Sequence, residues 1–249
     1  MKVGTIFENS QISLKKWFTA VLQVTTQKKS LSSLQLSRDI NVTQTTAWFM
    51  LHRIREVTKL ESFSIPLKST VEIDETYIGG KEKNKHQNKK TKSTQGCSTK
   101  TKTVVIGMIE RNGNAKAQVI TKVNSKTIEK IAINNILIGS TILSDEWGAY
   151  KVLEKLYNHE YINHDLGKYI RESVSTNTIE SFWALFKRGI IGLSYSIRKK
   201  HIERYLNEFV FRCNHKNYNV SNMFNAILLN TGNYLFYKAL VGRYETQSS

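Results

Sequence analysis

The sequence has little proline and cysteine and no long apolar run. Its 249 residues include one proline and two cysteines, Cys97 and Cys213. These cysteines are far apart and neither has a C-x-x-C partner, so we expect neither a disulfide framework nor a zinc cluster. No apolar run approaches the roughly 18 residues that span a bilayer, and the first residues lack the form of a signal peptide. We therefore expect a soluble, reduced, cytoplasmic protein with no membrane contact.

Acidic residues are also scarce. The chain has 20 Asp and Glu against 37 Lys and Arg, which gives a formal net charge of +17 and a sequence pI near 9.8. Such an excess predicts a polyanionic partner, although a merely basic protein is the alternative on charge alone. The 40% of hydrophobic residues is enough for one substantial core and a small second module.

Residues 10–60 are typical of a small helical module, with Trp17 and Val21 among the apolar residues at helical spacing. A break at Asn41 followed by Thr43, a predicted N-cap, indicates a helix-turn-helix. The alternative is an ordinary pair of packed helices. The second helix of a helix-turn-helix enters the major groove. The predicted DNA contacts are Gln44 and Thr45 at base edges and Arg53 and Arg55 at phosphates.

Pro66 marks the predicted domain boundary, because the helical pattern gives way there to a β-rich one. We predict a helical module over 1–64 and an α/β domain over 65–249, with a mixed sheet flanked by helices. Strands are expected at 70–73 and 140–143, and a hairpin turning at Asn112–Gly113. A helix is predicted to follow the N-cap Ser125, and the last third is mostly helical.

A low-complexity segment, residues 81–102, holds eight lysines and one glutamate. Such a segment cannot bury a core, and it is predicted to be either a solvated insertion or a direct DNA clamp. The predicted phosphate contacts in this segment and beyond it are Lys81, Lys83, Lys85, Lys89, Lys90, Arg188, Arg198, Lys199, Lys200 and Arg204.

Three acidic residues stand out by their positions. Asp74 and Asp145 each follow a predicted strand, and Glu180 lies on a predicted helix. Carboxylate oxygens converging from such elements suit Mg²⁺ or Mn²⁺, and two ions about 4 Å apart catalyse in-line phosphoryl displacement. Each acid alone has an ordinary alternative, such as a turn residue, an N-cap or a solvated surface pair. Their order along the chain makes the combination specific.

The helix that carries Glu180 has two distinct faces. Glu180 and Lys187 are only about 20° apart at 100° per residue, so Lys187 is predicted to hold a DNA phosphate beside the metal site. Asn177, one turn before Glu180, offers a neutral oxygen ligand. The apolar stripe predicted to pack on the sheet is Ile179, Phe182, Phe186 and Ile190, with Trp183 at its border.

Three blocks of this sequence, VEIDETYIGGK, SDEWGAY and NTIESFWALFKRGI, resemble the signature blocks of ISXO-like insertion-sequence transposases. These are bacterial DDE-type enzymes related to the eukaryotic Merlin elements. The resemblance runs from about Gly4 to Asn217, and it implies an RNase H-like catalytic domain. It also implies Asp74 and Asp145 as metal ligands, with Glu180 or Asn177 as the third. We favour Glu180, because a charged ligand holds a hard cation better than an amide.

The same resemblance assigns Lys187, Trp147, Tyr150 and Trp183 to the motif, although core packing is the alternative for the three aromatic residues. Two features depart from the family. Relatives commonly carry a zinc ribbon ahead of GTIFENS, for which no sequence is present here, so no zinc is expected in this chain. A His that often precedes the third ligand is replaced here by Ser175 and Thr176, which predicts reduced activity rather than loss of the metal site.

These observations predict a transposase of a bacterial insertion sequence. It binds the terminal inverted repeats, hydrolyses the phosphodiester at each end and joins the freed 3′ hydroxyls to target DNA. The expected cofactor is Mg²⁺ or Mn²⁺, with two ions, and the expected partner is double-stranded DNA in the nucleoid, bound by a homodimer or larger assembly. The alternatives are a helix-turn-helix regulator, an inactive transposase remnant, and a nuclease or resolvase.

Overall fold

The computed structural model describes residues 2–27, 30–59, 65–79, 102–145, 148–162, 176–193, 197–232, 235 and 240–241. The chain forms two compact units. Unit 1 comprises Met1–Leu60 and His215–Ser249, and unit 2 comprises Glu61–Asn214. In the described part of the chain, no helix is both long and apolar enough to cross a bilayer.

Unit 1 is helical. The predicted apolar face of its first helix is buried, with Trp17 1 % exposed and Val21 fully covered. Among its described residues, the helices with defined bounds are α1 (Leu14–Thr26), α2 (Ser33–Asp39), α3 (Gln44–Val57) and α7 (Val220–Leu229).

A tight turn joins α2 to α3. Asn41 has a positive φ of 49° there, a conformation that asparagine tolerates better than most residues. The Thr43 side chain accepts a hydrogen bond from the backbone N–H of Thr46 at 3.2 Å, as its prediction as an N-cap requires. The two helices also pack against each other. This geometry is that of a helix, a short turn and a second helix.

The end of the chain packs with its beginning. Helix α7 contacts α1, and the backbone N–H of Ile6 donates to the carbonyl of Thr231 at 2.9 Å. The predicted boundary at Pro66 placed every later residue in one domain. The contacts instead group the residues from His215 onward with the N-terminal helices. Sequence periodicity does not show such a return, because it reports which face of a helix is buried but not what covers it.

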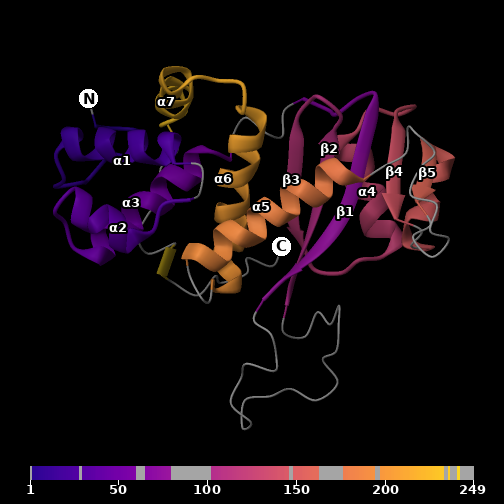
Figure 1. Ribbon diagram of the computed structural model, residues 1–249, viewed down its shortest axis with the longest axis horizontal. Coiled ribbons are helices and arrows are strands. Elements are labelled where there is room, and N and C mark those ends of the chain that lie inside the picture. The colour runs from indigo at the N-terminus through magenta and orange to yellow at the C-terminus, as the bar shows by residue number, and fades with distance from the viewer. Residues whose placement is uncertain are drawn as a thin grey trace, which may run out of the picture. The chain divides into compact units, whose positions relative to one another are not determined.

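Unit 2 is built on a five-stranded mixed sheet in the order β3-β2-β1-β4-β5 (Figure 1). Strands β1, β2 and β3 are antiparallel neighbours, whereas β4 pairs in parallel with both β1 and β5. The strands and α-helices described in this unit are β1 (Thr70–Ile78), β2 (Thr103–Glu110), β3 (Ala115–Ile120), α4 (Ser125–Asn135), β4 (Thr141–Asp145), β5 (Asn158–Ile162), α5 (Asn177–Leu193) and α6 (Ile202–Asn214). Two short 3-10 helices, η3 (Gly148–Lys155) and η5 (Lys199–His201), accompany them.

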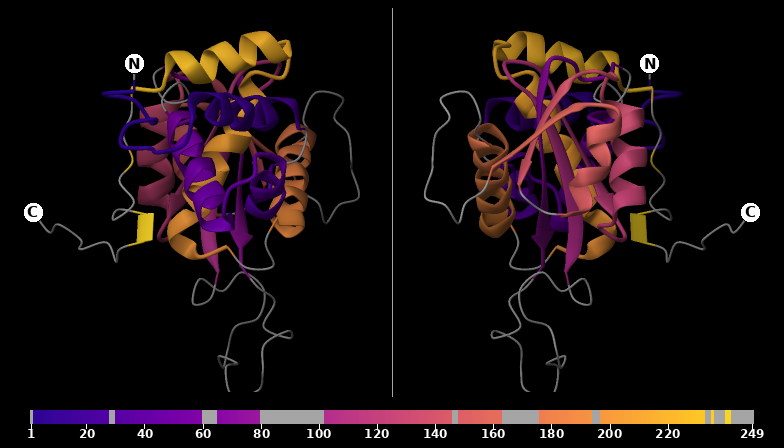
Figure 2. Two further views of the ribbon diagram at one scale, coloured as in Figure 1. Left: turned by 90° about the vertical axis from the view of Figure 1, so that its left-hand side faces the viewer. Right: turned by 90° about the vertical axis from the view of Figure 1, so that its right-hand side faces the viewer.

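Helices cover both faces of this sheet, and α4 and α5 lie on opposite sides of it (Figure 2). Strand residues of one parity, such as Ile73, pack with Ile128 of α4. Residues of the other parity, such as Ile78, pack with α5 and α6. The predicted α/β fold, a mixed sheet flanked by helices, is confirmed, and the strand order is that of an RNase H-like domain.

Three local details differ from the sequence prediction. Strand β1 does not end at Ile73 but continues to Ile78, because it keeps pairing with β2 as far as Ile78 opposite Thr103. Asp74 therefore lies inside a strand and does not follow one. Helix α4 is capped by Asn124, whose side chain accepts from Thr127, and not by Ser125. Strand β5 was not predicted. The hairpin at Asn112–Gly113 is present as expected.

Candidate active site

Asp74 and Asp145 are brought together by the register of two parallel strands. Strand β1 pairs with β4 through Glu72 opposite Leu143. Asp74 and Asp145 each lie two residues beyond that pair. In-register residues of parallel strands project to the same side of a sheet, and here that side is the one covered by α5. The sequence prediction that these two carboxylates share a location therefore agrees with the sheet register.

The electrostatics of Asp74 also show this proximity. Burial, followed by the negative charges of Glu75 and Asp145, raises the pKa of Asp74 to about 7. The Lys187 ammonium on α5 acts in the opposite direction and lowers it. A carboxylate in this position is poorly solvated and faces like charge that Lys187 compensates only in part, and a bound cation relieves such an environment.

The apolar stripe of α5 packs on the sheet as predicted. Ile179 and Phe186 are fully covered, and Trp183 is 2 % exposed. Gly107, the β2 residue paired with Asp74, makes close packing possible, because a Cβ at that position would lie 2.6 Å from the Trp183 ring. The glycine thus allows α5 to pack close to the sheet beside Asp74.

The polar face of α5 is exposed. Asn177, Glu180 and Lys187 are all exposed, and the Thr176 hydroxyl donates to Glu180 Oε1 at 3.0 Å. Of these side chains, Lys187 acts electrostatically on Asp74. Glu180 is on nearly the same face of the helix two turns earlier, about 10 Å along the axis.

The described residues do not form a complete metal site by themselves, since no group of three His, Cys, Asp or Glu side chains lies close enough together to hold an ion. Two carboxylates, Asp74 and Asp145, fit the oxygen chemistry of Mg²⁺ or Mn²⁺, and burial together with neighbouring negative charge raises the pKa of Asp74. Residues 146–147 and 163–175, which flank β4 and α5, lie outside the described part of the chain.

Two further glutamates of β1 were missed by the sequence prediction. Glu72 is fully buried and accepts hydrogen bonds from Arg111 Nε at 3.1 Å and from the backbone N–H of Ile179 at 2.9 Å. Glu75 lies on the other face, where the Tyr150 hydroxyl donates to it, and burial raises the pKa of Glu75. The signal in the sequence was the presence of three acids, Glu72, Asp74 and Glu75, within one nine-residue strand.

A Ser–His pair also occurs close to Asp145. Ser144 Oγ lies 2.8 Å from His159 Nε2, and His159 Nδ1 lies 3.8 Å from Glu154. Ser144 is fully buried, and burial lowers the pKa of His159. A nucleophilic serine has to reach its substrate, so this pair is part of the core between β4 and β5.

The predicted DNA contacts of unit 1 fall into two groups. Gln44 and Thr45 are exposed in the first turn of α3, as base readers require. Arg53 and Arg55 are only 4 % and 2 % exposed, which contradicts their prediction as phosphate contacts. Arg53 donates to the carbonyls of Ile6, Glu8 and Leu235, and Arg55 to Ser30 Oγ and the carbonyl of Leu31. Their guanidinium groups therefore connect α3 to segments of unit 1 that are distant in sequence.

The basic residues of unit 2 are also divided. Arg188, Arg198 and Lys199 are exposed, and Lys200 is half-buried. Arg204 is 8 % exposed and donates to the carbonyl of Lys200, so its prediction as a phosphate contact is contradicted. Lys81, Lys83, Lys85, Lys89, Lys90 and Trp147 lie outside the described residues.

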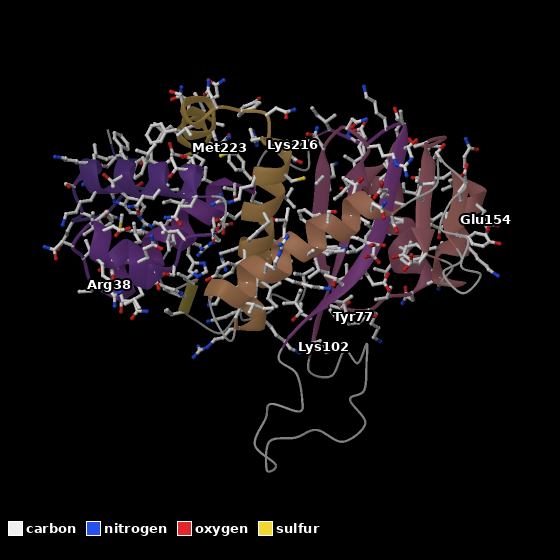
Figure 3. All side chains as sticks on the ribbon, in the orientation of Figure 1. Arg38, Tyr77, Lys102, Glu154, Lys216 and Met223 are labelled. Carbon is white, nitrogen blue, oxygen red and sulfur yellow. The ribbon has the colours of Figure 1, made fainter. Side chains whose placement is uncertain are left out.

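The described ends of β1 and β2 lie next to each other at the base of the sheet, where Figure 3 labels Tyr77 and Lys102. Residues 80–101, which join these two strands, include most of the predicted basic segment.

The pairing of two aspartates under a helix of an RNase H-like sheet coincides with a family match. Residues 66–214, more than half of the chain, match the model of the ISXO2-like transposase domain. The chain belongs to the ISXO2-like transposase family. Asp74, Asp145, Glu180 and Lys187 all lie within the matched transposase domain.

This transposase-family chain also resembles individual proteins at low sequence identity. It is 27% identical over 220 residues to an uncharacterized protein in transposable element ISH50 of Halobacterium salinarum, covering 85% of this chain and 73% of that protein. The solved catalytic domain of Mos1 mariner transposase aligns with 75% of this chain and 95% of its own, at 15% identity and a TM-score of 0.35. The transposase of a Mos1 paired-end complex with the left transposon end aligns with 92% of this chain and 83% of its own, at 15% identity and a TM-score of 0.34.

Proposed function

We propose that this chain is the DDE-type transposase of a bacterial insertion sequence, and that it cleaves DNA at the terminal inverted repeats and transfers the strands to a target. The observation that carries the proposal is the placement of Asp74 and Asp145 on adjacent parallel strands, under α5, in a member of a transposase family.

In this mechanism Asp74 and Asp145 would hold divalent metal, with Glu180 or Asn177 at the start of α5 as the third ligand. When bound there, Mg²⁺ or Mn²⁺, two ions in all, would supply the positive charge that an in-line phosphoryl displacement requires. Lys187, whose charge reaches Asp74, holds a phosphate of the scissile strand as a point charge. Glu75 points to the opposite face of the sheet by strand alternation, and there the Tyr150 hydroxyl donates to it.

DNA is bound by two kinds of contact in this proposal. Gln44 and Thr45 of α3 read bases in the major groove of the element ends. Arg188, Arg198 and Lys199, which are exposed, contact phosphates together with Lys200 and the lysines of residues 81–102. Two protomers are the smallest assembly that pairs two ends.

The test is a nicking and strand-transfer assay on DNA that contains the element ends, with Mn²⁺ or Mg²⁺ added. Asp74→Asn and Asp145→Asn are expected to abolish both reactions. Glu129→Gln, an acid of α4 on the opposite side of the sheet, serves as the matched control and is expected to retain them. Cleavage that survives both aspartate substitutions would rule out this active site.

An inert DNA-binding protein is the second candidate, favoured by the incomplete gathering of carboxylates among the described residues. Wild-type protein that binds end DNA but never cuts it in either metal would support this candidate. Cuts without rejoined products would instead indicate a nuclease or resolvase.

A further inference from the structure

Helix α5 begins in a way that differs from other helices of this chain. At α1, α2, α3, α4 and α7, a local Ser, Thr or Asn side chain accepts the backbone N–H three residues further on. Such local caps satisfy helix amides that have no partner inside the helix. The residue before α5 is Thr176, and its hydroxyl is directed to Glu180 instead.

The amide that a local cap would take at α5 is bound by a distant residue. The backbone N–H of Ile179, three residues after Thr176, donates to Glu72 Oε2 at 2.9 Å. Glu72 belongs to β1 and is 107 positions away in the sequence. The start of α5 is therefore attached to the central strand of the sheet.

The other carboxylate oxygen of Glu72 is also engaged. Arg111 Nε donates to Glu72 Oε1 at 3.1 Å, and the backbone N–H of Arg111 donates to the carbonyl of Thr70 at 2.9 Å. Glu72 has 1 % of its side chain exposed, against 29% for Arg111. A buried carboxylate with two donors in place has little freedom to change its geometry.

This attachment lies next to the proposed metal ligands. Glu72 and Asp74 are two residues apart on β1 and project to the same face, roughly 7 Å apart along the strand. Ile179 lies between Asn177 and Glu180, the two candidates for the third ligand. This hydrogen bond thus joins the strand that carries Asp74 to the helix turn that carries both candidates for the third ligand.

We propose that Glu72 is a positioning residue of the transposase active site, which fixes the first turn of α5 over Asp74 and Asp145. This inference rests on the proposed function. It assigns Glu72 no contact with metal or DNA. Its effect is to hold the third ligand where it can share an ion with the two aspartates.

The experiment measures Mn²⁺ binding by calorimetry on the full chain, independently of DNA cleavage. Glu72→Gln removes the charge at nearly constant volume, and Glu72→Asp keeps the charge but is one methylene too short for the Ile179 amide. The matched control is Glu208→Gln, since Glu208 is an equally buried glutamate of unit 2 that pairs with Arg212 at 2.9 Å within α6. Circular dichroism identifies which variants are folded, and Glu72→Asp carries the test where Glu72→Gln does not fold.

Both Glu72 variants are expected to raise the Mn²⁺ dissociation constant by about tenfold or more, the usual effect of losing a residue that orients a metal ligand. Glu208→Gln is expected to bind Mn²⁺ as the wild type does. Hydrogen exchange at the Ile179 amide is expected to accelerate in Glu72→Asp, whose carboxylate is too short to reach that amide, and to keep the wild-type rate in Glu208→Gln.

Two results overturn the inference in distinguishable ways. Unchanged Mn²⁺ affinity in the Glu72 variants, or an equal loss in Glu208→Gln, shows that Glu72 contributes only to the stability of the core. A wild-type protein that binds no Mn²⁺ and cuts no DNA removes the proposed function, and this inference with it.

Discussion

At the residue scale, the feature most relevant to chemistry is the placement of Asp74 in a half-buried position beside two other acids. Burial and the charges of Glu75 and Asp145 raise its pKa to about 7, against an ordinary value of 3.8. Enzymes place carboxylates in such environments when a cation or a proton is part of the reaction. When no cation is bound, this arrangement lowers the free energy of unfolding near neutral pH.

Asp74→Asn is therefore expected to stabilise the metal-free protein near neutral pH. Because the folded-state pKa is the higher one, the folded protein retains a proton that the unfolded chain releases between about pH 4 and pH 7. The Asp74 contribution to wild-type stability thus falls through this window and is constant above it. Thermal unfolding in the presence of a chelator should show a Tm difference between Asp74→Asn and the wild type that grows between about pH 4 and pH 7. A Tm difference that is the same at every pH would contradict the raised pKa of Asp74.

Arg53 illustrates a different role for a charged residue. Its guanidinium lies in the core of unit 1 and donates to three backbone carbonyls. Arg53→Met is expected to lower the free energy of unfolding by roughly 2–3 kcal/mol, the cost of buried acceptors without donors. Arg38→Met, at an exposed position of α2, is the matched control and should change it little. Denaturant unfolding measures both.

DNA binding distinguishes Arg53 from a phosphate contact. Provided that Arg53→Met is folded, the slope of its log Kd for DNA against log salt concentration should equal the wild-type slope. Loss of a true phosphate contact reduces that slope by about one, and such a reduction in Arg53→Met would show that its side chain reaches DNA.

The sequence could predict which α3 residues are apolar and buried, but not the burial of Arg53 and Arg55. Helical spacing places them on the flanks of the apolar face, where a long side chain can extend either way. The direction depends on acceptors that are remote in sequence, namely the carbonyls of Ile6, Glu8 and Leu235 for Arg53 and Ser30 and Leu31 for Arg55. The roles of Asp74 and Asp145 as metal ligands stay predictions. The sequence could associate each of them with a strand, but only the sheet register shows that they lie on the same face, and Asp74 lies within β1 and not after it.

At the element scale, α5 is the part of the fold that connects the sheet to the proposed chemistry. Its apolar stripe was predictable from period alone, and each member is buried. Its close approach to the sheet was not predictable, because that depends on Gly107, a residue of another element opposite Asp74. The attachment of its first turn through Glu72 was equally invisible, since the two partners are 107 residues apart.

Gly107→Ala is expected to displace α5 from the sheet. The new Cβ would lie 2.6 Å from Trp183 Cζ2, and such overpacking costs about 1–3 kcal/mol. A shift of about 1 Å at a catalytic helix can reduce the rate about 100-fold, so DNA cleavage should fall more than stability does. The measurements are Tm and the single-turnover cleavage rate.

The matched control for Gly107 is Gly148→Ala. Gly148 has no atom within 4 Å of its ideal Cβ position, so alanine there should leave Tm and cleavage close to wild type. Gly107→Ala with wild-type Tm and rate would mean that α5 tolerates a wider separation than the packing indicates.

At the scale of the whole molecule, the chain order and the folded units differ. The residues that form unit 2 lie between the two segments that form unit 1. The net charge of +17 belongs to the full chain, so a steep fall of DNA affinity with salt is expected of the intact protein. The proposed division assigns end recognition to unit 1 and cleavage to unit 2.

Residues 61–214 produced alone test that division, because this fragment keeps the whole sheet with α4, α5 and α6. We expect it to fold, to nick DNA in Mn²⁺, and to cut element ends no better than unrelated DNA, since Gln44 and Thr45 are absent. The same fragment with Asp74→Asn is the control for contaminating nuclease. Cleavage rates on end-containing and scrambled duplexes give the measurement. A fragment that still prefers the ends would move sequence recognition from α3 to unit 2.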